Sequence, residues 1–421
     1  MSAAARRAVV FVESNTSGTG RLFVRIAREM GYRPVLVAAK PEKYAYLADA
    51  DAPETIVVPR VDEEGVEALL RERFAEGEVA GVTSSSEYFI ATAAAVAARL
   101  GLAGPDADAV RAARDKSWQR EALAAGGVAA PAFRAVESAF DAVRAARETG
   151  FPVIVKPVGG SGSVGVLACA VEDEVERHAA ALLASAKGER VLVEALVDGP
   201  EFSVEMFSGR VIGITRKHLG APPAFVEAGH DHPAEVPGEV ARALEEASIR
   251  GTEILRLGWG PLHWELRMRG AEAVPIEVNP RLAGGFIPEL VRHARGIDLI
   301  RQTLRLVVGE AVDVEPRAHR HASIRFLFAP AAGRLARVEG MDDARALPDV
   351  VDVALYRAPG DALIIHGDFR DRMGHVIACA DRFDAACAAA ERARRAVRIV
   401  IGAGEGEGAA ALAGAAQTAA E

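Results

Sequence analysis

Residues 153–165 read VIVKPVGGSGSVG, an apolar run that ends in a lysine and passes directly into a loop of glycines and serines. The run Val153–Val155 is β-branched throughout, which favours a buried strand. Glycines let backbone N–H groups approach phosphate oxygens closely, and Lys156 adds a positive charge beside them. No Gly-Lys-Ser/Thr sequence opens a helix here, so the segment differs from a Walker A loop. It predicts a phosphate-binding strand and loop; the alternative is a surface hairpin in which Lys156 only ends the strand.

Two later segments, HWELR at 263–267 and PIEVNPR at 275–281, place polar side chains at alternate positions. Because side chains alternate across a strand, Glu277 and Asn279 share one face of the second segment. If the two segments pair as strands, these oxygens meet Glu265 of the first segment. Carboxylate and amide oxygens are ligands that Mg²⁺ prefers in proteins. We interpret the pair as a metal site; the alternative is the solvated face of an antiparallel sheet.

A third segment, VEALVDGPEFSVE at 193–205, joins two strand-like runs through a turn at Asp198-Gly199-Pro200. Such a connection predicts a hinge between two lobes. Backbone groups in a hinge can hold a nucleobase, while a nearby carboxylate binds the ribose hydroxyls. The segment supports this interpretation only together with the two segments above.

Short apolar runs alternate with helical segments over the first hundred residues, which predicts βαβ units and a parallel sheet. The predicted strands are 8–12, 34–37, 55–58 and 80–83, with a helix over 21–30. Ligands bind at the carboxyl edge of such sheets. The loops SNTSGTG at 14–20 and SSSE at 84–87 lie at that edge, although plain tight turns explain them equally well.

The pattern changes after residue 105. One helix is predicted over 106–126, and short connections then indicate antiparallel strands. The further predicted strands are 132–136, 152–157, 190–194, 201–207, 211–217, 262–268 and 273–279. Further helices are predicted over 138–149 and 239–257, and a closing helix over 382–399. The tail from residue 402 is almost entirely Ala, Gly and Glu and is expected to be disordered.

Composition narrows the class of protein. The chain has 421 residues, half of them hydrophobic, and a formal net charge of −9, as expected for a soluble protein of several domains. The acidic balance argues against a nucleic acid or an anionic membrane as the main partner. Three scattered cysteines fit a reducing compartment, and no apolar stretch is long enough for a signal peptide or a spanning helix. A cytoplasmic location is therefore expected.

Taken in chain order, these motifs resemble those of the ATP-grasp superfamily, in the carboxylate–amine ligase branch that includes bacterial L-amino-acid ligases. The residues that carry the resemblance are Asp115-Lys116, 153–165, Glu194–Val197, Glu201, Glu265 and 277–281. The resemblance implies an α/β fold of the α+β ATP-grasp type. An N-terminal parallel α/β domain precedes a two-lobed ATP-grasp unit with antiparallel sheets.

The expected divisions of the chain are 1–112 (N-terminal domain), 113–197 (small lobe with the glycine-rich loop), 198–310 (large lobe with the metal site), 311–401 (C-terminal lobe) and 402–421 (tail).

The resemblance also implies roles for individual residues. The residues expected to hold the ATP phosphates are Lys116, Lys156, Ser161, Gly162 and Ser163. Glu194 and Val197 match the adenine-binding hinge, and Glu201 matches the ribose-binding carboxylate. Glu265, Glu277 and Asn279 match the ligands of Mg²⁺, for which Mn²⁺ is an alternative. Arg281 matches the arginine that stabilises the transition state, and Lys156 is expected to act in catalysis with it.

Substrate residues are expected in the segment KHLGAPPAFVEAGH at 217–230, which resembles the substrate-side loop of bacterial L-amino-acid ligases. There Glu227 would hold an amino group, and His230 would orient a carboxylate or the attacking amine. A rigid proline-containing connection is the alternative interpretation. Arg267, Arg281 and the turn Gly284-Gly285 would hold a substrate carboxylate. The role of His263, next to a proposed metal ligand, stays open.

The predicted activity is an ADP-forming ligase that joins two amino acids, as a dipeptide or a γ-glutamyl amide, through an acyl phosphate. The expected partners are small amino-acid substrates, with a role in secondary metabolism, and a homodimer is a family-level expectation. One alternative is an ATP-grasp carboxylase that uses bicarbonate, and a second is a non-catalytic ATP-binding regulator. A D-alanine-type ligase fits the long region after residue 310 poorly.

Overall fold

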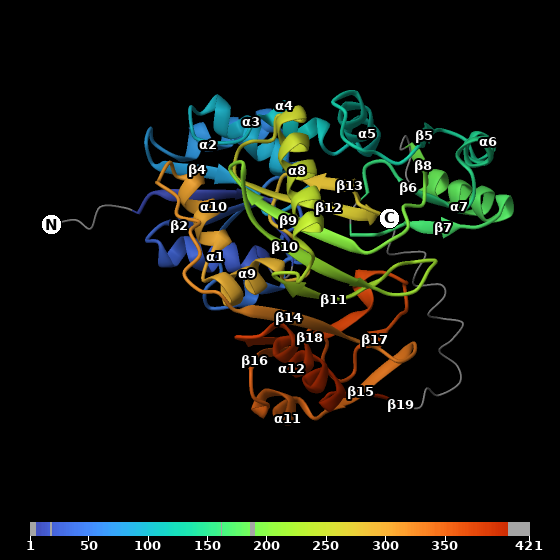
Figure 1. Cartoon of the computed structure of the whole chain (residues 1–421). Helices are drawn as coiled ribbons and strands as arrows, with labels where there is room; N and C mark the ends of the chain where they lie inside the picture. Colours follow the sequence, from blue (N-terminus) through green and yellow to red (C-terminus); the bar gives the residue numbers. More distant parts are fainter. Residues whose placement is uncertain (1–5, 17–18, 161, 186–189, 403–421) are drawn as a thin grey trace.

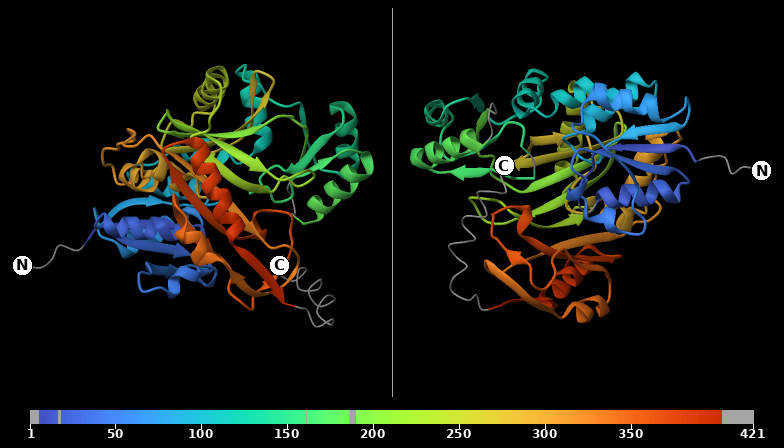
Figure 2. Two further views of the ribbon diagram at one scale, coloured as in Figure 1. Left: turned by 60° about the horizontal axis from the view of Figure 1, so that its bottom comes forward. Right: turned by 180° about the vertical axis from the view of Figure 1, so that it is seen from behind.

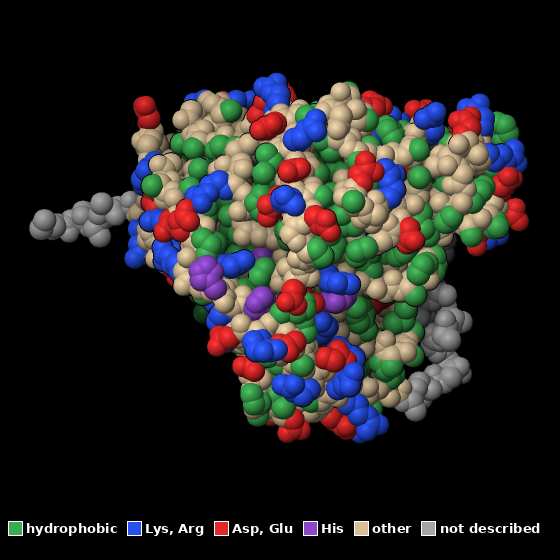
Figure 3. Space-filling view, viewed as in Figure 1, with side chains coloured by type: hydrophobic (Ala, Val, Ile, Leu, Met, Phe, Trp, Pro, Cys, Tyr) green, Lys and Arg blue, Asp and Glu red, His purple; other side chains and the backbone are tan. Residues whose placement is uncertain are grey.

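The computed structural model describes residues 6–16, 19–160, 162–185 and 190–402. Ser161 of the glycine-rich loop and the predicted tail beyond Gly402 lie outside the described residues. None of the described helices is long and apolar enough to cross a membrane. The face in Figure 3 mixes acidic and basic side chains without an extended area of one sign.

A parallel sheet opens the chain, as predicted (Figure 1). Its strands are, in spatial order, β3 (Glu54–Val57), β2 (Arg33–Ala38), β1 (Ala8–Val12) and β4 (Val79–Thr83). Alternate residues of β1 face two different cores. Val10 packs toward α2 (Glu63–Arg73) and α3 (Ile90–Arg99), whereas Phe11 packs toward α1 (Thr19–Glu29) and α10 (Leu299–Val307). The sheet of the N-terminal domain is therefore covered in part by a helix from much later in the chain.

The small lobe is an antiparallel sheet in the order β5 (Phe133–Val136), β8 (Val191–Ala195), β6 (Val153–Pro157) and β7 (Leu167–Cys169). Two helices, α6 (Ala139–Thr149) and α7 (Glu172–Ser185), pack against it. The prediction of one helix over 106–126 is wrong, because the chain forms α4 (Ala107–Ala112) and α5 (Lys116–Ala125) instead. Asp115 causes the break, since its carboxylate accepts from the N–H groups of Ser117 and Trp118 and caps α5.

An eight-stranded sheet fills the space between the N-terminal domain and the small lobe and extends into the C-terminal region (Figures 1 and 2). Its strands in spatial order are β13 (Glu272–Asn279), β12 (Pro261–Arg269), β9 (Glu201–Phe207), β10 (Arg210–Leu219), β11 (Glu227–His232), β14 (His321–Phe328), β18 (Arg372–Ala380) and β16 (Val350–Leu355). All its neighbouring strands run antiparallel. Because β11 pairs with β14, the sheet continues across the expected division at residue 310.

Helices cover this sheet on both faces. At one end α8 (Gly238–Ile254) packs over β9, β12 and β13 around the fully buried Trp264. At the other end α9 (Ile287–Arg295) and α12 (Phe383–Ala396) lie on opposite faces of β14 and β18. Ile377 packs toward α9, and its neighbour Ala378 packs toward α12. The sheet is thus buried on both faces where it joins the C-terminal region.

The C-terminal region ends differently from the prediction. The helix predicted over 382–399 ends at Ala396, because the chain turns into the strand β19 (Arg398–Gly402). This strand pairs with β15 (Gly333–Glu339), which also pairs with β17 (Ala362–Leu363). The short helix α11 (Met341–Ala346) completes this part.

Candidate functional site

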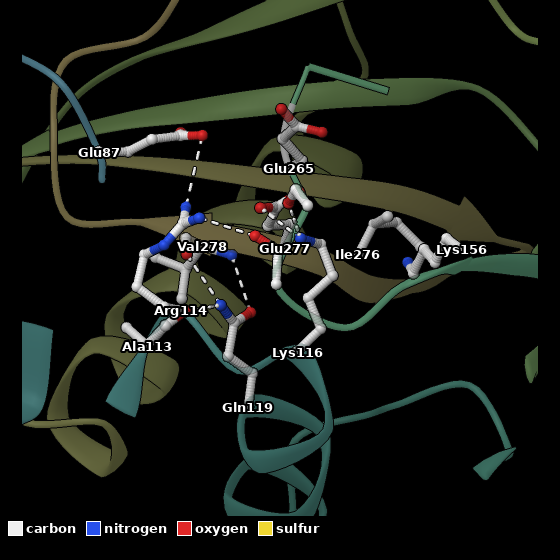
Figure 4. A network of polar contacts seen from close by, with 12 residues as sticks. Glu87, Ala113, Arg114, Lys116, Gln119, Lys156, Glu265, Ile276, Glu277 and Val278 are labelled. Atoms are coloured by element: carbon white, nitrogen blue, oxygen red, sulfur yellow. Dashed lines mark hydrogen bonds and ion pairs between the residues drawn. The ribbon is translucent and has the colours of Figure 1, made fainter. Parts of the chain in front are cut away.

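Lys116 joins the glycine-rich loop to one of the two predicted metal carboxylates. It is the first residue of α5, and its buried ammonium donates to the carbonyl of Gly160 and lies 3.1 Å from Glu277 (Figure 4). Gln119 fastens the same helix to β13 by donating to the carbonyl of Val278 and accepting from its N–H. The helix that carries Lys116 is therefore held in register with the strand that carries Glu277.

Lys156 belongs to a buried group of three charges. Its ammonium donates to Glu194, and Arg120 donates to the same carboxylate from Nη2 at 3.1 Å and from Nε at 3.2 Å. Burial raises the pKa of Glu194, but the two cations outweigh burial and hold the pKa below its usual value. Burial is also the main reason that the pKa of Lys156 is lowered. Arg120, which is fully buried, was not singled out from the sequence.

Arg267 contacts two residues of the expected hinge and ribose site, Val197 and Glu201. This arginine donates from Nε to Glu201 at 2.9 Å and from Nη1 to the carbonyl of Val197 at 3.0 Å. Its guanidinium also lies over the ring of Phe225, 5.0 Å from the centroid. Through these contacts Arg267 lies with Glu201 and Val197, which are expected to bind the nucleotide, whereas Arg281 contacts Glu87.

The predicted metal ligands are brought together. β12 and β13 pair as expected, with Glu265 opposite Glu277 and His263 opposite Asn279. The described residues contain no group of three or more His, Cys, Asp and Glu side chains that could hold a metal ion. Two carboxylates and one amide oxygen nevertheless suit Mg²⁺, which keeps waters and phosphate oxygens in its remaining positions. The donor set therefore fits a magnesium ion bound together with ATP phosphates.

His263 lies beside the expected metal ligand Glu265 and contacts its carboxylate. Its ring lies between two carboxylates, with Nδ1 2.9 Å from Glu205 and Nε2 3.0 Å from Glu265. Burial lowers the pKa of His263, but Glu205 and then Glu265 outweigh it and raise the pKa to about 9. The ring thus connects the buried Glu205 to the expected metal ligand Glu265.

Lys217 contacts three of the expected site carboxylates, a position that the sequence pattern alone does not indicate. Its buried ammonium lies 2.8 Å from Glu201, 2.7 Å from Glu227 and 3.2 Å from Glu265. Burial lowers the pKa of Lys217, but the three carboxylates outweigh it and raise the pKa well above its usual value. One cation therefore neutralises carboxylates expected to serve the ribose, the substrate and the metal.

The expected substrate residues Glu227 and His230 lie together on β11. The two side chains approach to 3.7 Å, and Glu227 also accepts from Arg372 at 2.7 Å. His230 is 1% exposed, and burial is the main reason that its pKa is lowered to about 3. Gly285 lies against this ring, because a Cβ atom placed on it would be 2.5 Å from the His230 Nε2.

Arg281 connects the site to the N-terminal domain. Its guanidinium donates to Glu87, which follows β4, and to the carbonyl of its neighbour Leu282 at 3.0 Å. Next to Arg281 a cavity of about 30 Å³ opens between the ends of β1 and β4, lined in part by Asn15, Ser84 and Ser85. This crevice is where the strand order of the sheet reverses, the usual ligand position in such sheets.

Replacing Gly285 by alanine is expected to weaken amino-acid binding and to lower the free energy of unfolding by about 1–2 kcal/mol. The residue has φ +59°, and the added methyl group would collide with His230. Kinetics with varied amino acid and urea unfolding measure the two effects. Gly309→Ala is the matched control, since Gly309 also has a positive φ, +76°, but a Cβ there meets nothing within 4 Å. Equal effects of the two substitutions would contradict the expected close packing at Gly285.

Acidification below pH 6.5 is expected to destabilise the protein through the buried histidines whose pKa is lowered, such as His232. His232 is fully buried, and burial, followed by Arg295 and His321, lowers its pKa to about 3 from 6.5. The unfolded chain therefore gains a proton first, so this stability is complete above pH 6.5 and is lost as the pH falls toward 3. The expected loss is at most about 1.4 kcal/mol per pH unit for each such histidine.

Urea unfolding between pH 7 and 5 measures this loss. His232→Gln keeps a side chain that can donate to or accept from Thr215, which lies 2.9 Å from the His232 Nδ1, and should flatten the pH profile. The exposed His319→Gln should leave the profile unchanged. If wild type, His232→Gln and His319→Gln gave the same pH profile, His232 would not be the cause of the loss of stability in acid.

Comparison with known proteins supports the resemblance to the ATP-grasp ligases. Residues 149–289 match the family model "ATP-grasp domain", and residues 325–402 match "L-amino acid ligase C-terminal domain 2". The chain is 38% identical to the uncharacterized protein y4rH of Sinorhizobium fredii, over 89% of this chain and 79% of that protein. It is 26% identical to alanine–anticapsin ligase of Bacillus amyloliquefaciens, over 66% of each chain.

Among solved structures, the L-amino acid ligase from Bacillus licheniformis superposes with a TM-score of 0.82 at 20% identity. The match covers 94% of this chain and 99% of that one. At this identity the superposition shows a shared fold, and it includes the C-terminal region as well as the two ATP-grasp lobes.

Proposed function

Because the chain belongs to the ATP-grasp ligases, in the branch of the L-amino acid ligases, we propose that it joins two amino acids in an ADP-forming reaction. One substrate would be activated at a carboxylate as an acyl phosphate, and the amine of the other would displace the phosphate. The products would be a dipeptide or a γ-glutamyl amide, ADP and phosphate.

The observation that supports this proposal most is the pairing of Glu265 with Glu277 in a strand register that also aligns Asn279, with a lysine beside each carboxylate. Bound Mg-ATP would supply the phosphoryl group. Glu265, Glu277 and Asn279 would hold the metal ion, while Lys116 and Lys156 would neutralise phosphate oxygens. Such positioning and charge neutralisation account for most catalysis of phosphoryl transfer.

Two further groups of residues would complete the reaction. Arg281 would stabilise the negative charge that develops on the carboxyl group, and Glu87 holds its guanidinium in place. The glycine-rich loop would exclude water, which otherwise hydrolyses the activated carboxylate. This loop reaches the C-terminal region, since Gly162 packs against the ring of Phe369. Glu227 and His230 would bind the amino acid.

Phosphate release with Mg-ATP across a matrix of paired L-amino acids tests the proposal, with product masses recorded. We expect release that depends on a particular pair, and a product lighter than the two amino acids by one water. Release with bicarbonate and no amino acid would identify the protein as a carboxylase instead. Binding of ATP without release under any condition would indicate a regulator.

A further inference from the structure

Arg372 and His230 leave polar atoms unsatisfied at one buried place. Both ring nitrogens of His230 and the Nε of Arg372 lack a hydrogen-bond partner among the residues that the structure describes. The two side chains lie around the same ring, because the Arg372 guanidinium sits 3.7 Å from the centroid of Phe326 and His230 meets that ring edge-on at 5.6 Å. Both also approach Glu227, at 2.7 Å and 3.7 Å.

Buried polar groups without partners are costly, so a group of them indicates a bound molecule or water. Arginine carries only donors, and His230 is neutral at pH 7 because burial lowers its pKa to about 3. The carboxylate of Glu227 is already matched by Lys217 and Arg372. What the place lacks is therefore a hydrogen-bond acceptor for the Arg372 Nε and the His230 N–H, and a carboxylate is an acceptor that a guanidinium binds well.

We propose that Arg372 and His230 bind a carboxylate of an amino-acid substrate, namely the one that is not activated. This inference rests on the proposed function. The activated carboxylate must lie near the expected metal ligands on β12 and β13. Arg372 comes from β18, which lies beyond β11 and β14 at the other side of Glu227, and is thus placed to hold a second carboxylate.

Arg372 lies within residues 325–402, so the C-terminal region would contribute to substrate recognition. Two substrates could present the free carboxylate. An amine substrate keeps its α-carboxylate, and a dicarboxylic substrate keeps one carboxylate while the other is activated. The chemistry of recognition is the same, a guanidinium stacked on an aromatic ring that donates to a carboxylate.

Steady-state kinetics of the full chain with Mg-ATP test the proposal. Arg372→Gln should raise the KM of one amino acid by roughly 10- to 100-fold, the range for a hydrogen bond to a charged group, and leave the KM of ATP unchanged. Arg372→Lys should recover part of the loss, because it keeps the charge. The matched control is Arg370→Gln, a neighbouring and more exposed arginine paired with Asp368, which should behave as wild type.

Substrate analogues identify the source of the carboxylate. Two analogues remove the free carboxylate: an amine substrate with a carboxamide in place of its α-carboxylate, and glutamine in place of glutamate as the activated substrate. With wild type, the analogue that lacks the recognised carboxylate should have a KM raised by the same factor as in Arg372→Gln. Arg372→Gln should no longer distinguish that analogue from the acid. Either source supports the proposal. The proposal would be overturned if Arg372→Gln left the KM of both amino acids unchanged. It would also be overturned if Arg372→Gln raised the KM of the acid and of its amide by the same factor.

Binding measurements separate this inference from the proposed function. If wild type releases no phosphate with any amino-acid pair, the proposed function fails. Calorimetric titration of amino acids and their amides into wild type and Arg372→Gln then still tests the proposed carboxylate site at Arg372 and His230. Tighter binding of the acid than of the amide in wild type only would support it, and no such difference would reject it.

Discussion

Glu277→Gln is expected to reduce phosphate release by about 10²- to 10³-fold while the protein stays folded. The substitution keeps size and one acceptor oxygen but removes the negative charge that faces Glu265 across the strand pair. A metal ion held by one carboxylate in place of two would bind more weakly, so fewer protein molecules would carry the ion that neutralises the phosphate charge. Lys116 would lose one partner but keep its hydrogen bond to Gly160, so only a small change in stability is expected.

Coupled assays of ADP formation at several Mg²⁺ concentrations measure this effect. Activity that partly returns at high Mg²⁺ would indicate weakened metal binding directly. Glu272→Gln is the matched control, because this residue lies on the same strand, exposed, and pairs with Arg269. Near-normal turnover of Glu277→Gln would remove Glu277 from the metal site.

Glu194→Gln is expected to lower the free energy of unfolding of the small lobe by about 3–5 kcal/mol. The substitution leaves the ammonium of Lys156 and the guanidinium of Arg120 close together around a neutral amide in a fully buried place. An uncompensated buried charge is among the few single changes with so large a cost. Weaker ATP binding should accompany it, since the position of Lys156 would no longer be fixed.

Hydrogen exchange of the amides in Val191–Ala195 reports this loss locally, and urea unfolding reports it for the chain. Glu148→Gln is the control, because this carboxylate is about half exposed and lies 3.8 Å from Arg134. Surface pairs of this kind contribute at most about 1 kcal/mol. A loss for Glu194→Gln no larger than that of the control would show that the two cations find other partners.

Local patterns predicted most of the strands and the alignment of the residues expected to bind the metal ion. The β1 and β9 segments are buried runs with clear ends, and the alternation in 263–267 and 275–281 placed Glu265, Glu277 and Asn279 on facing strands. Such features depend on residues close in sequence. The limits of the expected domains and the roles of the site residues stay predictions.

Contacts between distant segments could not be predicted in the same way. Lys217 lies among the site carboxylates because β10, which carries it, lies between β9 and β11 in the sheet. Arg372 lies near Glu227 because β14 and β18 continue that sheet beyond β11. Alternation along one strand says which face a residue occupies, but not which strand lies beside it. The helix break at Asp115 was visible in principle, because an Asp followed by helical residues is a common cap.

The pairing of β11 with β14 has a consequence for recombination between relatives. A crossover at residue 310 would give neighbouring strands to different parents, so the hydrogen-bonded edge of β11 would meet a partner that did not evolve beside it. A chain cut there would leave that edge open as a template for other chains, with aggregation as the expected result. The smallest exchangeable unit therefore runs unbroken from β9 through β18, and new substrate specificities would be transplanted only with that whole segment.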